Sequence, residues 1–303
     1  FDVKTEFHHI AGIGLARSAS KVLQEIQAYL GKEGIKLEET VIWNYNAFLP
    51  QAHELPAKQT VFDTVDNWSE HASYKKEAPL LRSNYQTIKN DADKIFTVSE
   101  GLLDLYNDKK ATWVPNGVDF DLFSKGTLEK LSSEKPRIGY IGTIQERVDF
   151  DLVAYLCEQH PNKQFDFYGP VWSGVQYKVD TLGKQFSNLT FHGRVAYKQL
   201  PEILKTIDVT IIPHKLDEFL ASTNPMKMYD YLAAGKPIVT TPGAGTEQFA
   251  DVLMIESEHK GFSEALNTAL ATDSLELMKQ RQERVKMHTW NHRLTDMFNH
   301  LGL

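Results

Sequence analysis

A lysine and an aspartate lie three residues apart in the stretch STNPMKMYDYLAAGKPIVTT, residues 222–241. Asn224 suits the N-cap of a helix and Pro225 suits its first position. The backbone N–H groups at such a helix start bind anions, phosphate above all. Lys227 would add a point charge to that anion, and Asp230, one turn deeper on the same face, suits a pair of hydroxyls such as those of a ribose. The pattern therefore predicts a nucleoside diphosphate lying across this helix start.

The alternative reading is an exposed ion pair on a solvated helix. Pairs of opposite charge at this spacing are common, and taken alone they explain Lys227 and Asp230 at least as well. In either case we expect Met226, Tyr229 and Ala233 to face inward.

The elements around this helix alternate between short apolar runs and stretches of helical periodicity. Strands separated by helices of roughly 10–15 residues indicate parallel βαβ units and a doubly wound sheet. Ligands of such sheets bind beyond the carboxyl ends of the strands. The apolar run VTIIP (209–213) ends just before the loop that leads to this helix, so the helix start would face that crevice. The expected strands are 137–142, 164–169, 189–193, 209–213 and 237–241, and the expected helices are 150–160, 177–186, 197–207, 261–271 and 274–288.

The amino-terminal part repeats this pattern less regularly. Helices are expected at 20–34 and 74–91, and strands at 39–46, 59–66, 93–100 and 111–117. The segment 120–135 is polar and loop-like, so we place a domain boundary after Gly117. The fold class is thus α/β, with two Rossmann-like domains facing each other across a cleft: 1–117 on the acceptor side and 118–288 for the donor. A helix at 289–303 could pack back on the first domain.

Composition limits the classes of function. The net charge is −7, and no part of the chain has the basic excess of a nucleic-acid or polybasic membrane site. No apolar run approaches a membrane span, and the single cysteine, Cys157, excludes an internal disulfide framework. The chain begins with Phe1, so we expect a longer native sequence. Two Asp-Phe-Asp triplets, 119–121 and 149–151, imitate a metal motif but read as a linker and a helix cap. No metal and no cofactor are predicted.

The segment NPMKMYDYLAAGKPIVTT resembles the donor-site motif of the GT-B retaining glycosyltransferases of the family 4 type, in the branch reading Pro-x-Lys-x-x-Glu-Tyr-Leu-Ala-Ala-Gly-Lys-Pro. VFDTVDNWSEH (61–71) is similar to the Tyr-Asp-x-x-Asp segment of polysaccharide and teichuronic-acid transferases. Further similar segments keep the family's order: ADKIFTVSEGL with VPNGVDFDLF (92–123), IGYIGTIQERVDFDLV (138–153), FHGRVAYKQLPEIL (191–204) and TWNHR (289–293).

The chain departs from the family's pattern in three places. The acidic pair spaced Glu-x7-Glu is not intact, because Asp230 matches the second acid while Ser222 stands at the first. Arg147 is followed by Val-Asp where the family has a lysine and a glycine. The family's opening strand and glycine-rich acceptor loop have no clear counterpart, which suggests a shortened amino-terminal domain.

The resemblance implies a hexosyltransferase-type enzyme that moves a sugar from a UDP- or GDP-linked donor to a cell-surface polysaccharide or lipid-linked saccharide, with retention and without metal. It implies a cytoplasmic protein, with peripheral contact at the inner face of the membrane as an option. Two alternatives stay open: a non-catalytic nucleotide-sugar-binding protein or degenerate partner subunit, and a nucleotide-sugar 2-epimerase.

The candidate catalytic residues are Asp66, Arg147 and Lys227. Arg147 and Lys227 would stabilise charge on the leaving phosphate. Asp66, after the strand TVFDTV, would orient the acceptor, although an Asp-Asn pair is also a common helix cap. The candidate donor-binding residues lie at strand ends and at the helix start. They are Gly142, Thr143, Gly193, Val195, Thr223, Asn224, Pro225, Met226 and Asp230.

Overall fold

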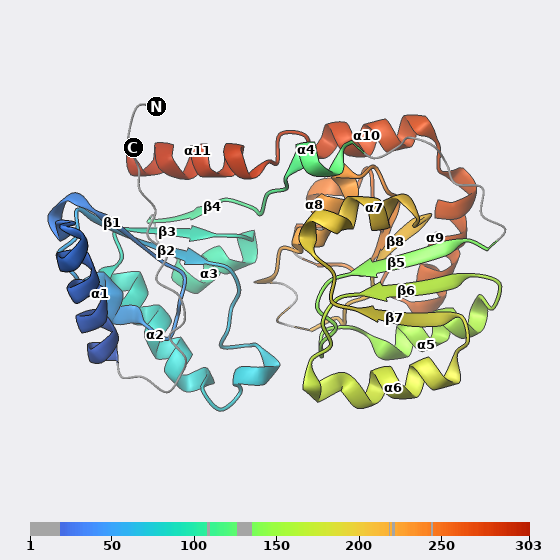
Figure 1. Ribbon diagram of the computed structural model, residues 1–303, viewed down its shortest axis with the longest axis horizontal. Coiled ribbons are helices and arrows are strands. Elements are labelled where there is room, and N and C mark those ends of the chain that lie inside the picture. Colours follow the sequence, from blue (N-terminus) through green and yellow to red (C-terminus); the bar gives the residue numbers. More distant parts are fainter. Residues whose placement is uncertain (1–18, 108–109, 126–134, 218, 220–221, 244) are drawn as a thin grey trace. The chain divides into compact units, whose positions relative to one another are not determined.

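The computed structural model describes residues 19–107, 110–125, 135–217, 219, 222–243 and 245–303. The chain divides into two compact units (Figure 1). Unit 1 takes in the chain up to Thr97 together with Leu102–Thr112, and unit 2 takes in Val98–Gly101 and Trp113–Leu303. Each unit holds one sheet with helices packed on it, which confirms the α/β class.

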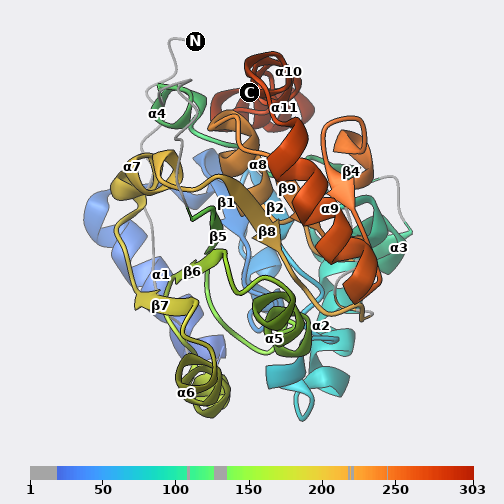
Figure 2. The same cartoon turned by 90° about the vertical axis from the view of Figure 1, so that its right-hand side faces the viewer.

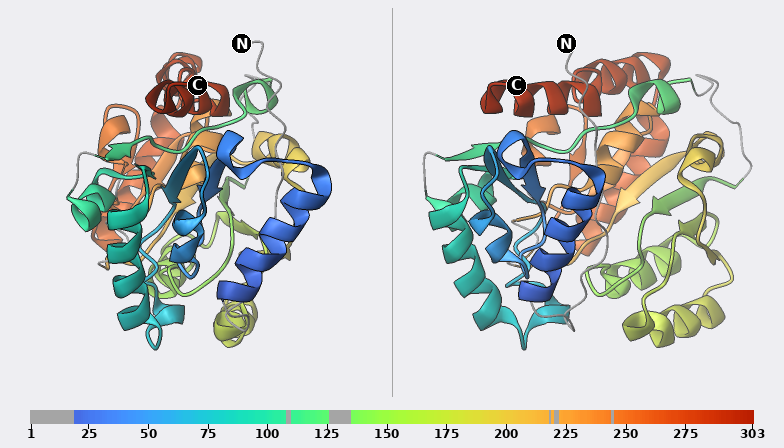
Figure 3. Two further views of the ribbon diagram at one scale, coloured as in Figure 1. Left: turned by 90° about the vertical axis from the view of Figure 1, so that its left-hand side faces the viewer. Right: turned by 60° about the vertical axis from the view of Figure 1, so that its left-hand side comes forward.

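Unit 1 is built on a four-stranded sheet in the order β1-β2-β3-β4, and its first two strand pairs are parallel. Leu81, Tyr85 and Ile88 of α2 pack on Phe62 and Ile95 of the sheet. The strands are β1 (Val41–Asn44), β2 (Gln59–Thr64), β3 (Lys94–Thr97) and β4 (Ala111–Trp113), and the helices are α1 (Ala19–Glu33), α2 (Ala78–Asp91) and α3 (Leu103–Tyr106). Figure 3 shows α1 in blue and α2 in teal beside this sheet.

Unit 2 contains a six-stranded sheet in the order β10-β9-β8-β5-β6-β7, and all neighbouring pairs are parallel. The strands are β5 (Arg137–Ile141), β6 (Gln164–Tyr168), β7 (Leu189–Gly193), β8 (Val209–Ile212), β9 (Ile238–Thr240) and β10 (Met254–Ile255). The order of strands along the sheet reverses between β5 and β8. This is the switch point at which doubly wound sheets bind their ligands.

Two hydrophobic clusters fill unit 2. The first holds apolar side chains of α5, α6 and α9, and the second those of α4, α7, α8 and α10. Figure 2 shows the helices around the unit 2 sheet. The helices are α4 (Phe120–Phe123), α5 (Phe150–Gln159), α6 (Gln176–Gln185), α7 (Leu200–Lys205), α8 (Met226–Ala233), α9 (His259–Thr272), α10 (Leu275–Val285) and α11 (Trp290–Leu301).

Most expected elements are present, with differences at their ends. Part of the segment expected to be loop-like forms the single turn α4, because the side chain of Asp119 accepts a hydrogen bond from Leu122 N and caps it; residues 126–134 lie outside the described part. The helix expected at 197–207 divides into a 3₁₀ turn, Tyr197–Gln199, and α7, which has Pro201 in its first turn. Proline lacks the N–H that a continuous helix would need there.

The chain passes into unit 2 before Trp113, ahead of the boundary expected after Gly117. The reason is local pairing: Val118 N donates to His288 O at 2.9 Å, and Val118 forms a parallel bridge with Thr289 at the start of α11. The segment 289–303 is likewise part of unit 2.

Two glycines allow the ends of β5 and β6 to approach each other. Gly142 and Gly169 have φ of +151° and +144°, values that side chains disfavour. A Cβ on Gly169 would overlap the carbonyl oxygen of Gly142. Gly142 N in turn donates to Tyr168 O at 2.9 Å, and this hydrogen bond joins the ends of β5 and β6.

We expect Gly169→Ala to lower the free energy of unfolding by about 2–4 kcal/mol, because both the strained φ and the overlap with Gly142 must be relieved. The matched control is Gly183→Ala in α6, where a new Cβ would meet only Phe191 Cδ2 at 3.9 Å. That change should leave stability unchanged or raise it by about 0.5–1 kcal/mol. Calorimetry of both variants measures the difference. Equal unfolding temperatures for Gly169→Ala and Gly183→Ala would refute the role given to Gly169.

Candidate functional site

Lys227 lies at the switch point of the unit 2 sheet. It is the second residue of α8, and its side chain extends over the end of β5. Its Nζ is 5.2 Å from the ring centroid of Tyr140, and a Cβ on Gly142 would come within 2.6 Å of its Cε. The absence of a side chain at Gly142 therefore makes room for the lysine.

The start of α8 differs from the expected cap. Pro225 is the N-cap and Met226 the first helical residue, one position later than expected. The Oδ1 of Asn224 does not cap the helix, because it accepts a hydrogen bond from Asn116 N at 3.1 Å. Thr223, Asn224 and Pro225 are all buried, so their side chains belong to the packing of the loop.

One inward-facing residue was wrongly predicted. Tyr229 and Ala233 are fully buried, as expected, but Met226 is 55% exposed. Because Pro225 is the cap, Met226 is the first residue of the first turn. Its exposure leaves it accessible to a ligand at the helix start.

Positive charge collects around Lys227. Burial and the nearby Arg147 guanidinium lower the pKa of Lys227 to about 7, although Asp230 acts in the opposite direction. The Arg147 guanidinium lies 5.4 Å from the centroid of the Phe219 ring. An arginine close to a partly desolvated lysine forms a site that favours an anion.

His214 belongs to the same cluster. It follows β8, it is 1% exposed, and its Nε2 has no hydrogen-bond partner among the described residues. Burial, Lys227 and Arg147 together hold its pKa well below the usual value, so the imidazole is neutral. Sequence reasoning missed this residue, although its position directly after Ile212 and Pro213, at the carboxyl end of a predicted strand, was a usable signal.

Asp230 carries the negative charge of the site, and a hydroxyl already binds it. Tyr197 OH donates to Asp230 Oδ1 at 3.2 Å. Burial raises the pKa of Asp230 to about 7 and Asp119 adds to this, while the Tyr197 hydroxyl and Lys227 lower it. The carboxylate is thus placed to accept hydrogen bonds from hydroxyls, the chemistry expected for a ribose. Tyr197 was not predicted, because the sequence placed it inside a helix.

The glycine corners at the ends of β5, β6 and β7 form one continuous edge. Gly169 packs on Gly142, and Gly169 N donates to Gly193 O at 2.7 Å. Gly193 has φ of +74° and open space where a Cβ would be. Thr143 O accepts a hydrogen bond from Tyr140 OH at 3.0 Å, which fixes the first corner. Val195 is half-buried and packs on the second cluster of unit 2.

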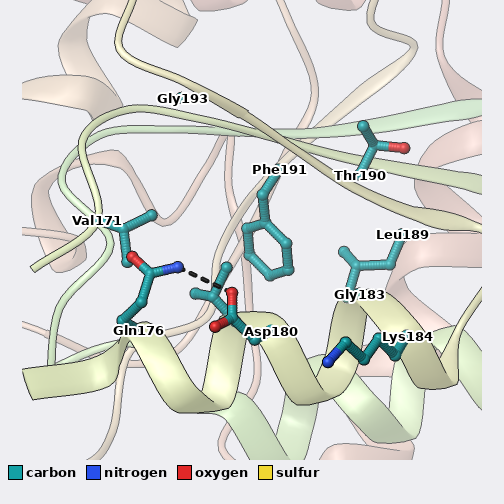
Figure 4. Close-up of a pocket in the computed structure, with 10 residues that line it drawn as sticks. Val171, Gln176, Asp180, Gly183, Lys184, Leu189, Thr190, Phe191 and Gly193 are labelled. Carbon is teal, nitrogen blue, oxygen red and sulfur yellow. Dashed lines mark hydrogen bonds between the residues drawn. The ribbon is translucent and has the colours of Figure 1, made fainter. Parts of the chain in front are cut away.

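A hollow between α6 and β7 does not coincide with this cluster (Figure 4). It is lined by residues such as Lys184, Thr190 and Phe191, and Gln176 Nε2 donates across its rim to Asp180 Oδ1 at 2.9 Å. Gly193 lies at one end of it, but neither Lys227 nor Arg147 contributes to its lining.

Comparison with known proteins relates this chain to glycosyltransferases. The glycosyl transferase-like family matches residues 151–299. A curated relative is TuaH of Bacillus subtilis (strain 168), provisionally named a teichuronic acid biosynthesis glycosyltransferase. It is 25% identical over 268 residues, which cover 81% of this chain and 67% of the TuaH sequence.

Solved structures with the same fold span nearly the whole chain. Sucrose-phosphate synthase from Thermosynechococcus elongatus superposes with a TM-score of 0.78 at 16% identity, covering 93% of this chain and 76% of its own. Anabaena HepE, solved in complex with UDP and glucose, gives 0.72 at 14% identity, covering 94% and 81%.

The chain has the fold of the GT-B glycosyltransferases, and its residues 151–299 match the glycosyl transferase-like family.

Asp66, the residue predicted on the acceptor side, lies in unit 1. Asp66 is two residues beyond β2 in unit 1 and is half-buried. Its backbone oxygen accepts a hydrogen bond from Tyr85 OH at 3.1 Å. The role of the Asp66 carboxylate in orienting an acceptor stays a prediction.

The raised pKa of Asp230 makes the stability of the protein depend on pH. The folded protein holds this proton up to about pH 7, whereas the unfolded chain releases it near 3.8. Between these values the folded state binds more protons, so the free energy of unfolding falls as pH rises. Asp230→Asn should remove this contribution, making the variant more stable relative to the parent by about 1–3 kcal/mol as pH rises across the window.

Thermal unfolding at several pH values measures this difference. The control is Asp180→Asn, which replaces an exposed carboxylate on α6. Its unfolding temperature should change with pH in the same way as that of the parent. A pH-independent difference for Asp230→Asn would show that Asp230 stays ionised in the folded protein.

Proposed function

We propose that this glycosyltransferase moves a hexose from a UDP- or GDP-linked sugar to a saccharide or lipid-linked saccharide of the cell envelope. The observation that carries the proposal is the cluster of Arg147, His214 and Lys227 at the switch point of unit 2, beside the carboxylate of Asp230. Related chains support it, because the HepE structure contains UDP and glucose and a trehalose-6-phosphate protein of E. coli was solved with UDP-2-fluoro glucose.

The proposed chemistry depends on where negative charge develops. Transfer breaks the bond between the anomeric carbon and the diphosphate oxygen, and the electron pair stays on that oxygen. Arg147 and protonated Lys227 would stabilise this charge, which lowers the barrier most where solvent is excluded. An arriving diphosphate would also raise the pKa of Lys227 above about 7, because an opposite charge favours the protonated form. Binding of the donor would thus favour the protonated form of Lys227, which in turn stabilises the charge of the diphosphate.

Retention follows if the acceptor attacks from the face that the diphosphate leaves. The acceptor hydroxyl then forms the new bond to the anomeric carbon and passes its proton to an oxygen of the departing phosphate. We include retention and independence of metal ions in the proposal. Peripheral contact with the inner face of a membrane would place the protein beside a lipid-linked acceptor. Among the described residues, no helix is both long enough and apolar enough to cross a bilayer.

A second candidate is a protein that binds nucleotide sugars without turning them over. Ser222, which stands where relatives carry an acid, is engaged in its own loop: its Oγ donates to Phe219 O at 2.8 Å, and its carbonyl accepts from Ser99 Oγ at 3.0 Å. Incubation with a panel of UDP- and GDP-sugars and saccharide acceptors, with and without EDTA, separates the two. Product in the presence of EDTA supports the transferase, whereas nucleotide binding without transfer or hydrolysis supports the second candidate.

We expect Lys227→Ala to weaken UDP or GDP binding about 10–100-fold, because it removes a partly desolvated charge contact to the diphosphate. The charge-matched control is Lys184→Ala in the hollow beside α6, which should bind as the parent does. Isothermal titration measures both. The reverse result, with nucleotide binding impaired in Lys184→Ala and unchanged in Lys227→Ala, would show that the nucleotide binds in that hollow and not at Lys227.

Arg147→Ala should reduce kcat about 100-fold while changing the donor KM less than tenfold, because its charge matters most when the phosphate departs. Arg284→Ala is the control, since Arg284 forms an exposed pair with Asp251 at 2.7 Å. Steady-state kinetics on one donor measure both variants. Parental kcat in Arg147→Ala would exclude the arginine from the reaction.

A further inference from the structure

Asn116 joins the loop before α8 to the C-terminal helix. Its Nδ2 donates to Asn224 O at 2.6 Å, and its backbone N donates to Asn224 Oδ1 at 3.1 Å. On its other side, Asn116 Oδ1 accepts from Arg293 Nη1 at 3.2 Å, and the same nitrogen donates to Pro115 O at 2.7 Å. One asparagine therefore connects the segments VPNG and TWNHR to the helix that carries Lys227.

The arginine of this network is held in place by the start of α11. Arg293 is only 7% exposed, and its guanidinium lies 5.6 Å from the centroid of the Trp290 ring. Trp290 N donates to Val118 O at 3.3 Å, which pairs the helix start with the linker. A Cβ on Gly117 would come within 2.8 Å of Trp290 N, so the linker can approach this closely only with glycine there.

The loop at the other end of the network has little freedom to find other partners. Asn224 is 5% exposed, and Asn116 supplies the hydrogen bonds found at its backbone and side-chain oxygens. A buried carbonyl that loses its donor is costly to leave unpaired. The loop would have to shift if these bonds were removed. Because Pro225, the N-cap of α8, follows Asn224 directly, such a shift would move Met226 and Lys227 as well.

We propose that Asn116 and Arg293 are positioning residues, which hold the Thr223–Met226 loop where the helix start and Lys227 can receive a diphosphate. Neither residue acts on the ligand directly. The effect on nucleotide binding rests on the proposed function, whereas the effect on the loop does not.

The test compares variants at the two ends of α8. Asn116→Ala removes the 2.6 Å bond to the loop and the contact to Arg293 but keeps its own backbone N–H. Arg293→Lys keeps the charge and loses the forked geometry. The matched control is Arg281→Lys: Arg281 is 5% exposed, its Nε donates to Gly235 O at 2.9 Å just beyond the other end of α8, and it pairs with Asp273.

We expect Asn116→Ala to weaken UDP binding about tenfold and Arg293→Lys to weaken it several-fold, with a rise in donor KM larger than the fall in kcat. Arg281→Lys should lower the melting temperature at least as much as the other two and leave UDP affinity unchanged. If the loss of UDP affinity is proportional to the fall in melting temperature in all three variants, the network only stabilises the fold. That result would overturn the proposal.

Amide hydrogen exchange without ligand tests the same point independently. Peptides covering 222–230 should exchange faster in Asn116→Ala, while peptides around Gly235 respond only in Arg281→Lys. Unchanged exchange at 222–230 in Asn116→Ala overturns the positioning role, whatever the binding data show. If the parent protein binds neither UDP nor GDP and transfers no sugar, the proposed function fails, and the exchange data still decide the role of Asn116.

Discussion

The packing of the Lys227 side chain against the end of β5 is the interaction on which the site depends. The ammonium lies over the Tyr140 ring and beside Gly142, with Arg147 near enough to lower its pKa. That arrangement requires glycine at position 142, because a side chain there would collide with Lys227. It also requires glycine at position 169, because a side chain there would overlap the backbone of Gly142. A cation placed there is partly desolvated, and the carboxylate of Asp230 lies near it. An incoming anion is therefore stabilised both by charge and by the shortage of competing water.

The topology of the sheet explains how distant residues meet at this point. Strands β5 and β8 are parallel neighbours, so their carboxyl ends lie at one edge, and Gly142, His214 and the start of α8 follow from them. His214 contributes bulk and a neutral nitrogen beside Lys227 and Arg147. Asp230 sits one helical turn beyond Lys227 and holds the Tyr197 hydroxyl. The result is a cationic end and a hydroxyl-binding end on one helix, as the proposed binding of a nucleoside diphosphate requires.

Helix α8 is also anchored at both ends by buried arginines of the C-terminal helices. Arg281 of α10 donates to Gly235 O beyond its last turn, and Arg293 of α11 reaches its first turn through Asn116 and Asn224. Gln282 adds a bond to Ala233 O at 3.0 Å. A helix of only eight residues has little stability of its own. Its exact placement, and with it that of Lys227, is therefore set by tertiary contacts.

The sequence alone determined the α/β class, nearly all the strands and the helix that carries Lys227 and Asp230, because periodicity and turn residues are local signals. The GT-B resemblance is confirmed by the comparisons. Only the tertiary structure decided that Asn224 bonds to Asn116 and does not cap α8, that Met226 is exposed, and that His214, Tyr197 and Arg293 lie around the site. These outcomes depend on which buried polar atoms find partners across as many as 178 residues of chain, and local sequence patterns do not contain that information.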